Sequence, residues 1–480
     1  MRLAAALAAL TLIRLIVAAT TPLAPDEAYY WTWSHALAAG YADHPPMVAL
    51  WIKAGTMIAG ERALGVRLLG PLSAALGSWL LADAADRLFP GRRAGVVAAL
   101  LLNATLFLGV GSVIMTPDTP LLFFWCATVW ALARIAANAR PGWWLVAGAF
   151  AGLALDSKYT AVMLVAGVVG WLAWVPPLRR WLIRPAPWLG ALLGFALFLP
   201  NLAWNQQHGW ISMAKQGGRV ADWRPERAVG FLAELLGSQL GLATPGVWLL
   251  CMAGLVAAGR IAWWSRNPGW SLLAALSLPP LAVFVQHALG DRVQGNWPAI
   301  IYPAAAIAAA GLAGPIWLRL RGPAIGLGFG ITALAYLQAA FGLFPLPSRL
   351  DPIALRLSGW DGLATQVEAA RQAAGAGYVA ADDYALAAEL AWDLPTGVPV
   401  VGSDARWAYT ALPKASDAHM IGLLVRSSRR SDGPDPAMWH DAGLVGEAVR
   451  STSGAVVETY RLFKVGASPL PARAVRLPSR

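Results

Sequence analysis

The chain has 480 residues, of which 58% are hydrophobic and 13% are charged. Because soluble proteins carry about 25% charged residues, this composition excludes an ordinary soluble domain and predicts a membrane protein with several spans. The formal net charge of +11 is expected to reflect basic cytoplasmic loops, and not a nucleic-acid-binding surface. Cys126 and Cys251 lie in separate apolar runs, so they predict neither a disulfide framework nor a zinc site.

The first apolar run is predicted to be a retained membrane span. Arg14 interrupts its core, and no clear small-residue cleavage site precedes Pro25, as a cleaved signal peptide would require. A span needs about 20 apolar residues, which gives about eleven candidates in this chain. The candidates lie near 3–21, 64–86, 94–112, 119–138, 142–155, 159–176, 187–204, 243–263, 270–289, 297–317 and 322–345. The sequence therefore predicts an all-α polytopic bundle over residues 1–349.

The region 142–176 decides the predicted orientation, because it reads either as one long run or as two short spans divided by Asp156-Ser157-Lys158. With two spans, every turn on the inner side carries at least two arginines, as the positive-inside rule expects. Merging the two would invert every later turn. The arginines of these inner turns are Arg87, Arg92, Arg93, Arg134, Arg140, Arg179, Arg180, Arg184, Arg260, Arg266, Arg319 and Arg321. An odd number of spans then places the C-terminal tail outside.

Two short amphipathic segments, 47–60 and 229–241, are predicted to lie along the membrane surface. The connection 205–228 is long for a bundle, and its basic residues make it a candidate for substrate contact. The tail 350–480 is richer in charge and is predicted to form a small α/β domain outside the membrane. A helix is expected at 361–374, capped by Asp361, with strands at 378–380, 399–401, 420–425 and 457–465.

The stretch 25–46 follows the first span and reads PDEAYYWTWSHALAAGYADHPP. Ionisable groups at a membrane edge cost free energy unless they are paired, solvated or used, and polar-tipped aromatic rings favour that edge. A functional site is therefore expected here. In the alternative interpretation, the acids cap a helix and His44 is a turn residue. The residues concerned are Asp26, Glu27, Tyr29, Tyr30, Asp43 and His44.

The other outer turns carry Asp118, Asp156 with Lys158, and Asp291-Arg292 followed by Asn296-Trp297. A helical bundle would bring these turns together on one face. Carboxylates suit deprotonation of an acceptor or binding of a divalent cation, and the sequence leaves a metal requirement open. Basic side chains suit a phosphate leaving group. Alternatively, Asp118 caps the span beside it and Lys158 snorkels to the interface.

The same segments carry a resemblance. The first-loop sequence, the TPDTPLLFFW and SKYT turns and, more weakly, GNWPAIIYP resemble the bacterial dolichyl-phosphate-mannose–protein mannosyltransferase-like (family 39) glycosyltransferases. These enzymes have the GT-C fold and include the aminoarabinose transferases that modify lipid A. The resemblance covers about residues 1–345. It departs from the aminoarabinose transferases after the acidic pair, so it does not indicate their acceptor.

The resemblance implies an inverting transfer of a sugar from a polyprenyl (undecaprenyl) phosphate. Asp26 corresponds to the catalytic carboxylate, Glu27 to its support and Asp118 to the second acidic position. Lys158 would contact the donor phosphate. Apart from the resemblance, Arg292 or a basic residue of the 205–228 connection is expected to assist it. The turn at Asp43 and His44 would line the substrate cavity. Tyr29, Tyr30 and Trp297 are expected to line it as well.

We therefore expect a bacterial inner-membrane glycosyltransferase whose site and C-terminal domain face the periplasm. Its acceptor would be lipid A, another glycan or a protein. A transporter or lipid flippase is the alternative, but its usual paired mid-membrane charges are not seen in the sequence. A non-catalytic scaffold would leave the acids and aromatics of the first loop unexplained.

Overall fold

The computed structural model describes residues 2–217, 223–344, 351–415, 420–452, 455–467, 470 and 473–480. Two compact units divide the chain, and neither is continuous in sequence. The first unit contains Met1–Ile16, Asp43–Val48 and Leu69–Leu334. The second unit contains Val17–Ala42, Ala49–Leu68 and Ala335–Arg480. The expected domain boundary near residue 350 falls on 345–350, outside the described residues, and stays a prediction.

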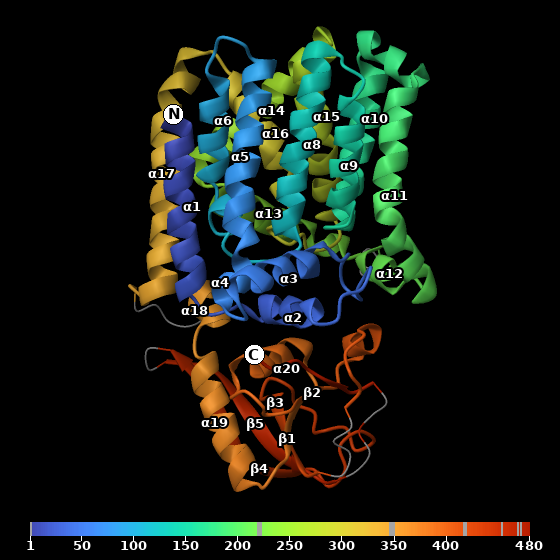
Figure 1. The fold of residues 1–480 in the computed structure, drawn as a ribbon. Coiled ribbons are helices and arrows are strands. Elements are labelled where there is room, and N and C mark those ends of the chain that lie inside the picture. The colour runs from blue at the N-terminus through green and yellow to red at the C-terminus, as the bar shows by residue number, and fades with distance from the viewer. Residues whose placement is uncertain are drawn as a thin grey trace. The chain divides into compact units, whose positions relative to one another are not determined.

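The first unit is a bundle of helices that run alternately up and down (Figure 1). Proline at the first helical turn starts several of them, as its fixed φ angle favours. The principal elements are α1 (Arg2–Thr20), α5 (Leu69–Leu88), α6 (Ala94–Asn103), α7 (Leu106–Gly109), α8 (Asp118–Asn138), α9 (Trp143–Leu155), α10 (Val162–Trp174), α11 (Pro185–Gln207), α12 (Ile211–Gly217), α13 (Ala228–Leu242), α14 (Pro245–Trp264), α15 (Pro268–His287), α16 (Tyr302–Gly311) and α17 (Pro315–Phe341). The predicted amphipathic segments are also helical, as α3 (Met47–Ala59) and α13.

The described helices do not confirm eleven membrane spans. Seven are long and apolar enough to cross a membrane, or up to eight if the bent pair Tyr159–Trp174 and Pro176–Ile183 forms one span. The candidates near 94–112, 142–155 and 297–317 contain apolar helices of only 10–17 residues. At 94–112 the cause is local: α6 ends at Asn103, and Thr105 caps α7 by accepting a hydrogen bond from the Leu108 N–H. A hydropathy window counts apolar residues, so it does not detect a helix end and a new helix start within one apolar run.

Helices α9 and α11 approach each other closely through glycines. A Cβ atom at Gly148 would collide with the backbone of Gly190, and one at Gly152 would collide with the backbone of Gly194. Each helix thus carries two glycines four residues apart, the spacing that lets membrane helices come into backbone contact. This packing fixes α9, and the turn that follows it, against the rest of the bundle.

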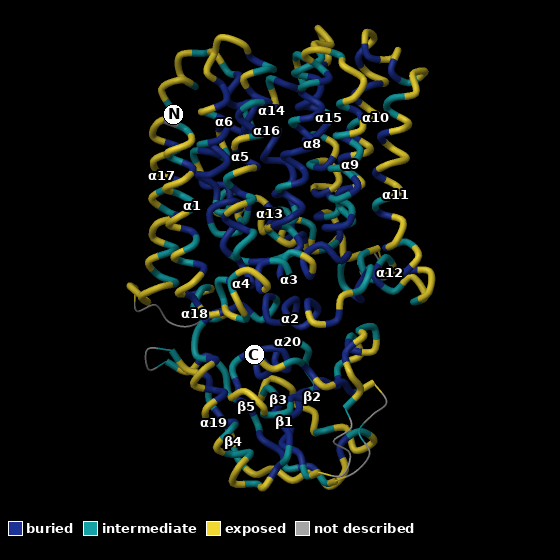
Figure 2. The backbone as a smooth tube through the Cα atoms, in the orientation of Figure 1, coloured by how far each residue is buried: buried dark blue, intermediate teal, exposed yellow. Residues whose placement is uncertain are grey.

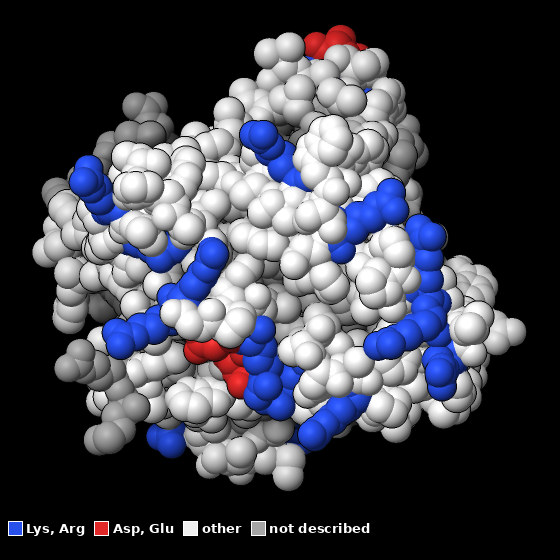
Figure 3. Space-filling view, turned by 90° about the horizontal axis from the view of Figure 1, so that it is seen from above, with Lys and Arg blue, Asp and Glu red and all other residues white. Residues whose placement is uncertain are grey.

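Basic side chains gather on the end of the bundle that is uppermost in Figure 1, and few acids accompany them (Figure 3). The connections at this end include Arg92 and Arg93 before α6, Arg140 before α9, and Arg266 before α15. These turns are among those predicted to face the cytoplasm. Their clustering on one end is the distribution that the positive-inside rule describes.

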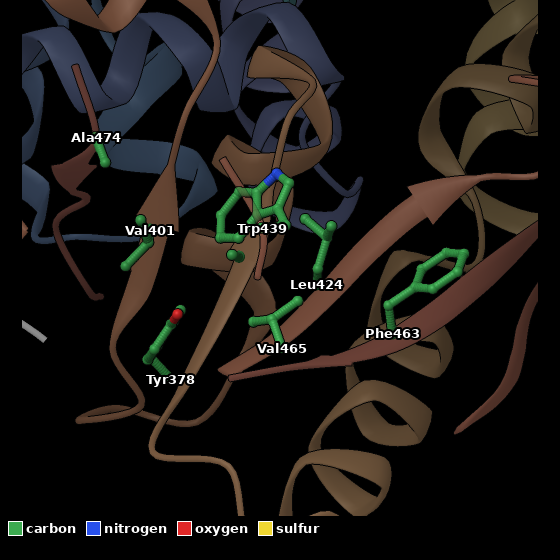
Figure 4. Close-up of a cluster of buried hydrophobic side chains, with 8 residues drawn as sticks. Tyr378, Val401, Leu424, Trp439, Phe463, Val465 and Ala474 are labelled. Atoms are coloured by element: carbon green, nitrogen blue, oxygen red, sulfur yellow. The ribbon is translucent and has the colours of Figure 1, made fainter. Parts of the chain in front are cut away.

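The second unit contains a six-stranded sheet with the order β4-β5-β3-β1-β2-β6. Its strands are β1 (Tyr378–Ala381), β2 (Val400–Gly402), β3 (Gly422–Ser427), β4 (Gly443–Thr452), β5 (Ala455–Val465) and β6 (Val475–Arg476). β1 pairs in parallel with β2 and β3, and the outer pairs are antiparallel. Helices α18 (Pro352–Leu357), α19 (Trp360–Ala373) and α20 (Tyr384–Asp393) belong to the same unit. One cluster of its core includes Tyr378, Leu424, Trp439 and Phe463 (Figure 4).

The predicted small α/β fold of the tail is thus present, with two differences. Helix α19 begins at Trp360 after Gly359, a left-handed residue with φ +81°, so Asp361 lies in the first turn and is not the cap. Strands β4 and β6 and helices α18 and α20 were not predicted. β4 is mostly exposed along its first half, so it lacks the alternation of apolar residues that signals a half-buried strand.

The stretch 25–46 after the first span was expected to lie at the membrane edge, but its first part is a buried helix. It forms helix α2 (Pro25–Ser34), and eight of its residues are buried (Figure 2). Tyr29 lies 4.6 Å from Tyr384 and 5.3 Å from Trp407 between ring centroids, and Trp31 lies 4.9 Å from Trp392. These aromatic side chains pack within the second unit against α20 and its neighbours, and do not form a membrane-edge belt. Sequence alone does not distinguish the two environments, because both favour large aromatic rings.

Candidate functional site

Three turns of the first unit meet at Asp118. The Lys158 Nζ atom lies 2.8 Å from Asp118 Oδ1 and 2.9 Å from Oδ2. The Asn296 side-chain amide donates to Asp118 Oδ2 at 2.6 Å. These residues come from the start of α8, the turn after α9 and the residue before the 3-10 helix Trp297–Ile301. The predicted convergence of the second, third and fifth outer turns is therefore present.

The Lys158–Asp118 ion pair is largely buried, which strengthens its electrostatic interaction. The side chains of Lys158 and Asp118 are 7% and 19% exposed, so the ion pair is partly removed from water and its attraction is weakly screened. The Asp118 carboxylate holds the ammonium group in one position, and the Asn296 amide in turn holds the carboxylate. A fixed, nearly buried ammonium group can bind a phosphate oxygen and stabilise charge that develops on a phosphate leaving group.

Asp156 lies in the same turn as Lys158, and the segment 43–48, distant in the sequence, contacts it in space. Burial raises the pKa of the Asp156 carboxyl to about 7, and its backbone oxygen accepts the Met47 N–H at 3.0 Å. Asp43 forms an ion pair with Lys215 of α12, and Gln216 donates to the Asp43 backbone oxygen at 2.8 Å. The long connection after α11 thus contacts the first outer loop. Its residues 218–222 lie outside the described part of the chain.

The other predicted residues of this face are less buried. Arg292 pairs with Glu234 at 2.8 Å, and the two side chains are 65% and 46% exposed. His44 is half-buried. The Trp297 ring lies 5.9 Å from the His287 ring. A role of Arg292 in phosphate binding, and roles of His44 and Trp297 in a substrate cavity, stay predictions.

Glu27 is held by a partner that was not predicted. Arg67 donates to both carboxylate oxygens of Glu27, from Nε at 2.7 Å and from Nη2 at 2.6 Å. Arg67 also donates to the backbone oxygens of Ala18, Thr21 and Pro22, and Glu27 accepts the Ala24 N–H. The two side chains are 0% and 1% exposed. The capping alternative therefore describes Glu27. An arginine inside the apolar run 64–86 signals a buried acidic partner, but the run does not identify which acid.

Asp26 lies in the first turn of α2, half-buried, and lines a cavity of about 520 Å³ within the second unit. Tyr29 and Tyr30 are 2% and 7% exposed and are not among the residues of this wall. The structure gives them a packing role, and their predicted role in a substrate cavity stays untested. Asp26 belongs to the second unit and Asp118 to the first, so joint action of the two carboxylates stays a prediction.

Across the described residues, no group of three or more His, Cys, Asp or Glu side chains is arranged to hold a metal ion. Two carboxylates of the first unit are instead paired with basic groups, Asp118 with Lys158 and Asp43 with Lys215.

Comparison with known proteins supports the resemblance drawn from the first loop. Residues 43–204 match the family described as dolichyl-phosphate-mannose-protein mannosyltransferase. The chain is also similar to the lipid A galacturonosyltransferase RgtD of Rhizobium johnstonii, with 29% identity over 346 residues, 70% of this chain and 68% of that protein. These matches confirm the predicted family resemblance. They also confirm the predicted enzyme class, a glycosyltransferase.

Solved structures agree with the fold. The crystal structure of ArnT from Cupriavidus metallidurans in the apo state matches with a TM-score of 0.63 at 15% identity, covering 95% of this chain and 96% of that chain. The same protein bound to undecaprenyl phosphate matches with a TM-score of 0.62 at 14% identity and the same coverage. At this identity the likeness shows the fold, which is the predicted GT-C type.

Proposed function

We propose that this relative of the dolichyl-phosphate-mannose–protein mannosyltransferases transfers a sugar from a polyprenyl phosphate to a lipid A-type glycolipid. The reaction takes place on the outer face of a bacterial inner membrane. The observation that carries the proposal is the ammonium group of Lys158, which is held by both carboxylate oxygens of Asp118, while the Asn296 amide donates to the same carboxylate. Among known relatives, ArnT binds undecaprenyl phosphate and RgtD acts on lipid A by name.

The end of the bundle at which Lys158 lies supports a lipid-linked sugar donor. The turn after α9, which carries Lys158, lies at the end of the bundle opposite to the arginine-rich turns (Figure 1). The positive-inside rule assigns the arginine-rich turns to the cytoplasm. Lys158 then faces the periplasm. Nucleotide sugars are cytoplasmic, so a site on the outer face needs a sugar carried across on a lipid.

The transfer step follows from these groups. The acceptor hydroxyl oxygen attacks the anomeric carbon, and the bond from that carbon to the phosphate oxygen breaks. Asp26 takes the hydroxyl proton as general base, and Lys158 stabilises the departing polyprenyl phosphate. Displacement from the opposite side inverts the anomeric centre.

The remaining acids have supporting roles in this proposal. Glu27 is a positioning residue, because its ion pair with Arg67 and its bond to the Ala24 N–H fix the start of α2 and therefore the position of Asp26. Asp118 is a positioning residue for Lys158. Neither carboxylate needs to contact the substrate.

A transfer assay tests the proposal. Purified protein in detergent is mixed with radiolabelled undecaprenyl-phosphate sugars, one at a time, and with a cell-envelope acceptor fraction. Asp26→Asn should reduce transfer by about 10²–10⁴-fold, the usual contribution of a general base. Glu447→Gln changes an exposed acid of β4 and should leave transfer unchanged. Thermal unfolding of each variant checks that it is folded.

Transfer of label by the wild type and not by Asp26→Asn would support both the reaction and the base. Equal transfer by the two would exclude Asp26 as the base. No transfer from any donor by folded wild type would contradict the proposal, and lipid flipping in vesicles would then test the transporter alternative.

A further inference from the structure

The second unit contains a cavity that no predicted role explains. Its volume of about 520 Å³ lies in the range of small-molecule sites, roughly 300–1,000 Å³. The wall is formed by the start of α2, by α18 and α19, by the β1–α20 connection and by strands β3, β4 and β5. All of these segments belong to one unit.

The fixed part of the wall is built around Arg450, which is buried. Arg450 donates to the backbone oxygens of Leu355 and Ser358 at 3.1 and 3.0 Å, and its guanidinium lies 4.1 Å from the centre of the Trp360 ring. It therefore holds α18 and the start of α19 against β4, and its role is structural.

Three of the four acids of the wall, Asp382, Asp383 and Glu458, are already engaged. Asp382 forms ion pairs with Arg426 at 2.8 Å and with Arg430 at 3.0 Å. Asp383 caps α20 through the N–H groups of Ala385 and Leu386. Glu458 accepts the Ser427 hydroxyl and faces Arg429 and Arg450 at 3.5 and 3.6 Å. These carboxylates are therefore not positioned to repel an anion as free charges would.

Three arginines of the wall retain donors for a ligand. Arg429 and Arg430 are 68% and 42% exposed, and each makes one ion pair to an acid of the wall. Arg356 is exposed, and the described residues include no ion pair to it. A guanidinium has five N–H donors in a planar fork, which suits bidentate binding of phosphate. Three such groups around one cavity indicate an anionic ligand.

Asp26 connects this cavity to the reaction. It lines the same wall as Arg356 and Arg430, and it is the group proposed to deprotonate the acceptor. Lys158, the group proposed to bind the donor phosphate, belongs to the other unit and does not line the cavity. A molecule held by these arginines with a hydroxyl at Asp26 is therefore the acceptor.

We propose that the cavity binds the phosphorylated saccharide head group of the acceptor, with Arg356, Arg429 and Arg430 contacting its phosphate. The inference rests on the proposed function for the identity of the ligand as acceptor. It assigns specificity for the acceptor to the C-terminal sheet and the start of α2, and it gives the arginines a binding role. Their charge would select acceptors that carry phosphate over those that do not.

A direct binding experiment tests the site apart from transfer. Glucosamine 1-phosphate is titrated into the full-length protein in detergent by isothermal calorimetry, with glucosamine as the uncharged comparison. Wild type should bind the phosphorylated sugar at least 10-fold more tightly than glucosamine. Arg356→Ala/Arg429→Ala should abolish this preference, and Arg356→Lys should retain part of it. The matched control is Arg476→Ala, an exposed arginine of β6 outside the wall.

A second arm uses the transfer assay with phosphorylated and dephosphorylated lipid A as acceptors. Arg356→Ala/Arg429→Ala should raise the KM for phosphorylated acceptor at least 10-fold and leave the donor KM unchanged. A rise in donor KM instead would reassign the cavity to the donor phosphate and overturn the inference, as would absence of glucosamine 1-phosphate binding by wild type. Binding with the expected preference but no transfer would contradict the proposed function and leave the anion site standing.

Discussion

At the scale of single residues, the chain uses buried ion pairs for two different purposes. The Glu27–Arg67 pair is fully enclosed, and the donors of Arg67 that the structure describes serve the carboxylate, nearby backbone oxygens and the Thr21 hydroxyl. The Lys158–Asp118 pair lies in a turn and keeps some exposure. The first pair therefore stabilises the start of α2, whereas the second can exchange its carboxylate for a ligand oxygen.

Arg67→Ala should destabilise the protein by about 3–5 kcal/mol, because it leaves a buried carboxylate without its partner. Thermal unfolding in detergent measures the change. The double variant Glu27→Gln/Arg67→Met removes both charges and should lose less stability than Arg67→Ala. If the double variant were the less stable of the two, the charge of Glu27 would not be the cause.

Lys158→Ala should reduce kcat by about 10²–10³-fold, the usual effect of removing one group that stabilises developing charge. Lys158→Arg retains the charge and should recover part of the rate. Lys414→Ala, at an exposed lysine of the second unit, is the control and should leave kcat unchanged. A Lys158→Ala enzyme with normal kcat and a raised donor KM would show that Lys158 only binds the donor.

At the scale of elements, glycine spacing decides how closely the helices that carry the site can pack. Gly148 and Gly152 of α9 face Gly190 and Gly194 of α11, where a Cβ atom would collide with the opposite backbone. The turn after α9 carries both Asp156 and Lys158. Displacement of α9 would therefore move the ammonium group of the site as well as the packing.

Gly194→Leu should destabilise the bundle by about 1–3 kcal/mol, the usual cost of overpacking, and should also lower transfer by displacing the turn at Lys158. The matched control is Gly170→Leu in α10, where a Cβ atom meets no neighbour within 4 Å. Thermal unfolding measures the change in stability, and the transfer assay measures the change in activity. Equal stability of the two variants would show that the α9–α11 contact is not close in the folded protein.

At the scale of the whole molecule, residues far apart in sequence build the second unit. Helix α2 packs against α20, so the stretch after the first span is part of the same core as the C-terminal sheet. The pocket that contains Asp26 depends on this packing, since most of its wall comes from residues after 350. Removal of the tail would therefore expose the aromatic side chains of α2 and dismantle the wall.

The stability of the second unit should depend on pH through Asp393 at the end of α20. Burial raises the pKa of this carboxyl to about 6, although Arg480 opposes the shift. The native state then binds more protons than the unfolded state between about pH 4 and 6, so this group lowers stability as pH rises through that interval. Asp393→Asn should gain roughly 1–2 kcal/mol above pH 6 after allowance for solvent screening. Thermal unfolding across pH 4–8 should show no gain near pH 4, and a gain independent of pH would exclude this cause.

The amino-acid sequence by itself determined the class of this protein. Its low charge and apolar runs require a membrane bundle, and its arginine-rich turns indicate which ends face inward. Local patterns also predicted α19, β1, β2, β3 and β5, because period and caps are encoded by neighbouring residues. Likewise, the motifs around Asp26, Asp118 and Lys158 carried the resemblance to a family, since they are short and contiguous.

Only the tertiary structure decided which of these side chains are partners. The Glu27–Arg67 pair joins residues 40 positions apart, and the Asn296–Asp118 bond joins residues 178 apart. Such contacts depend on how helices pack, and local patterns do not encode that packing. The aromatic run of α2 and the arginines around the cavity show the same limit. Their chemistry was visible in the sequence, but whether a ring faces lipid or protein, and which acid a guanidinium faces, is set by elements distant in the chain.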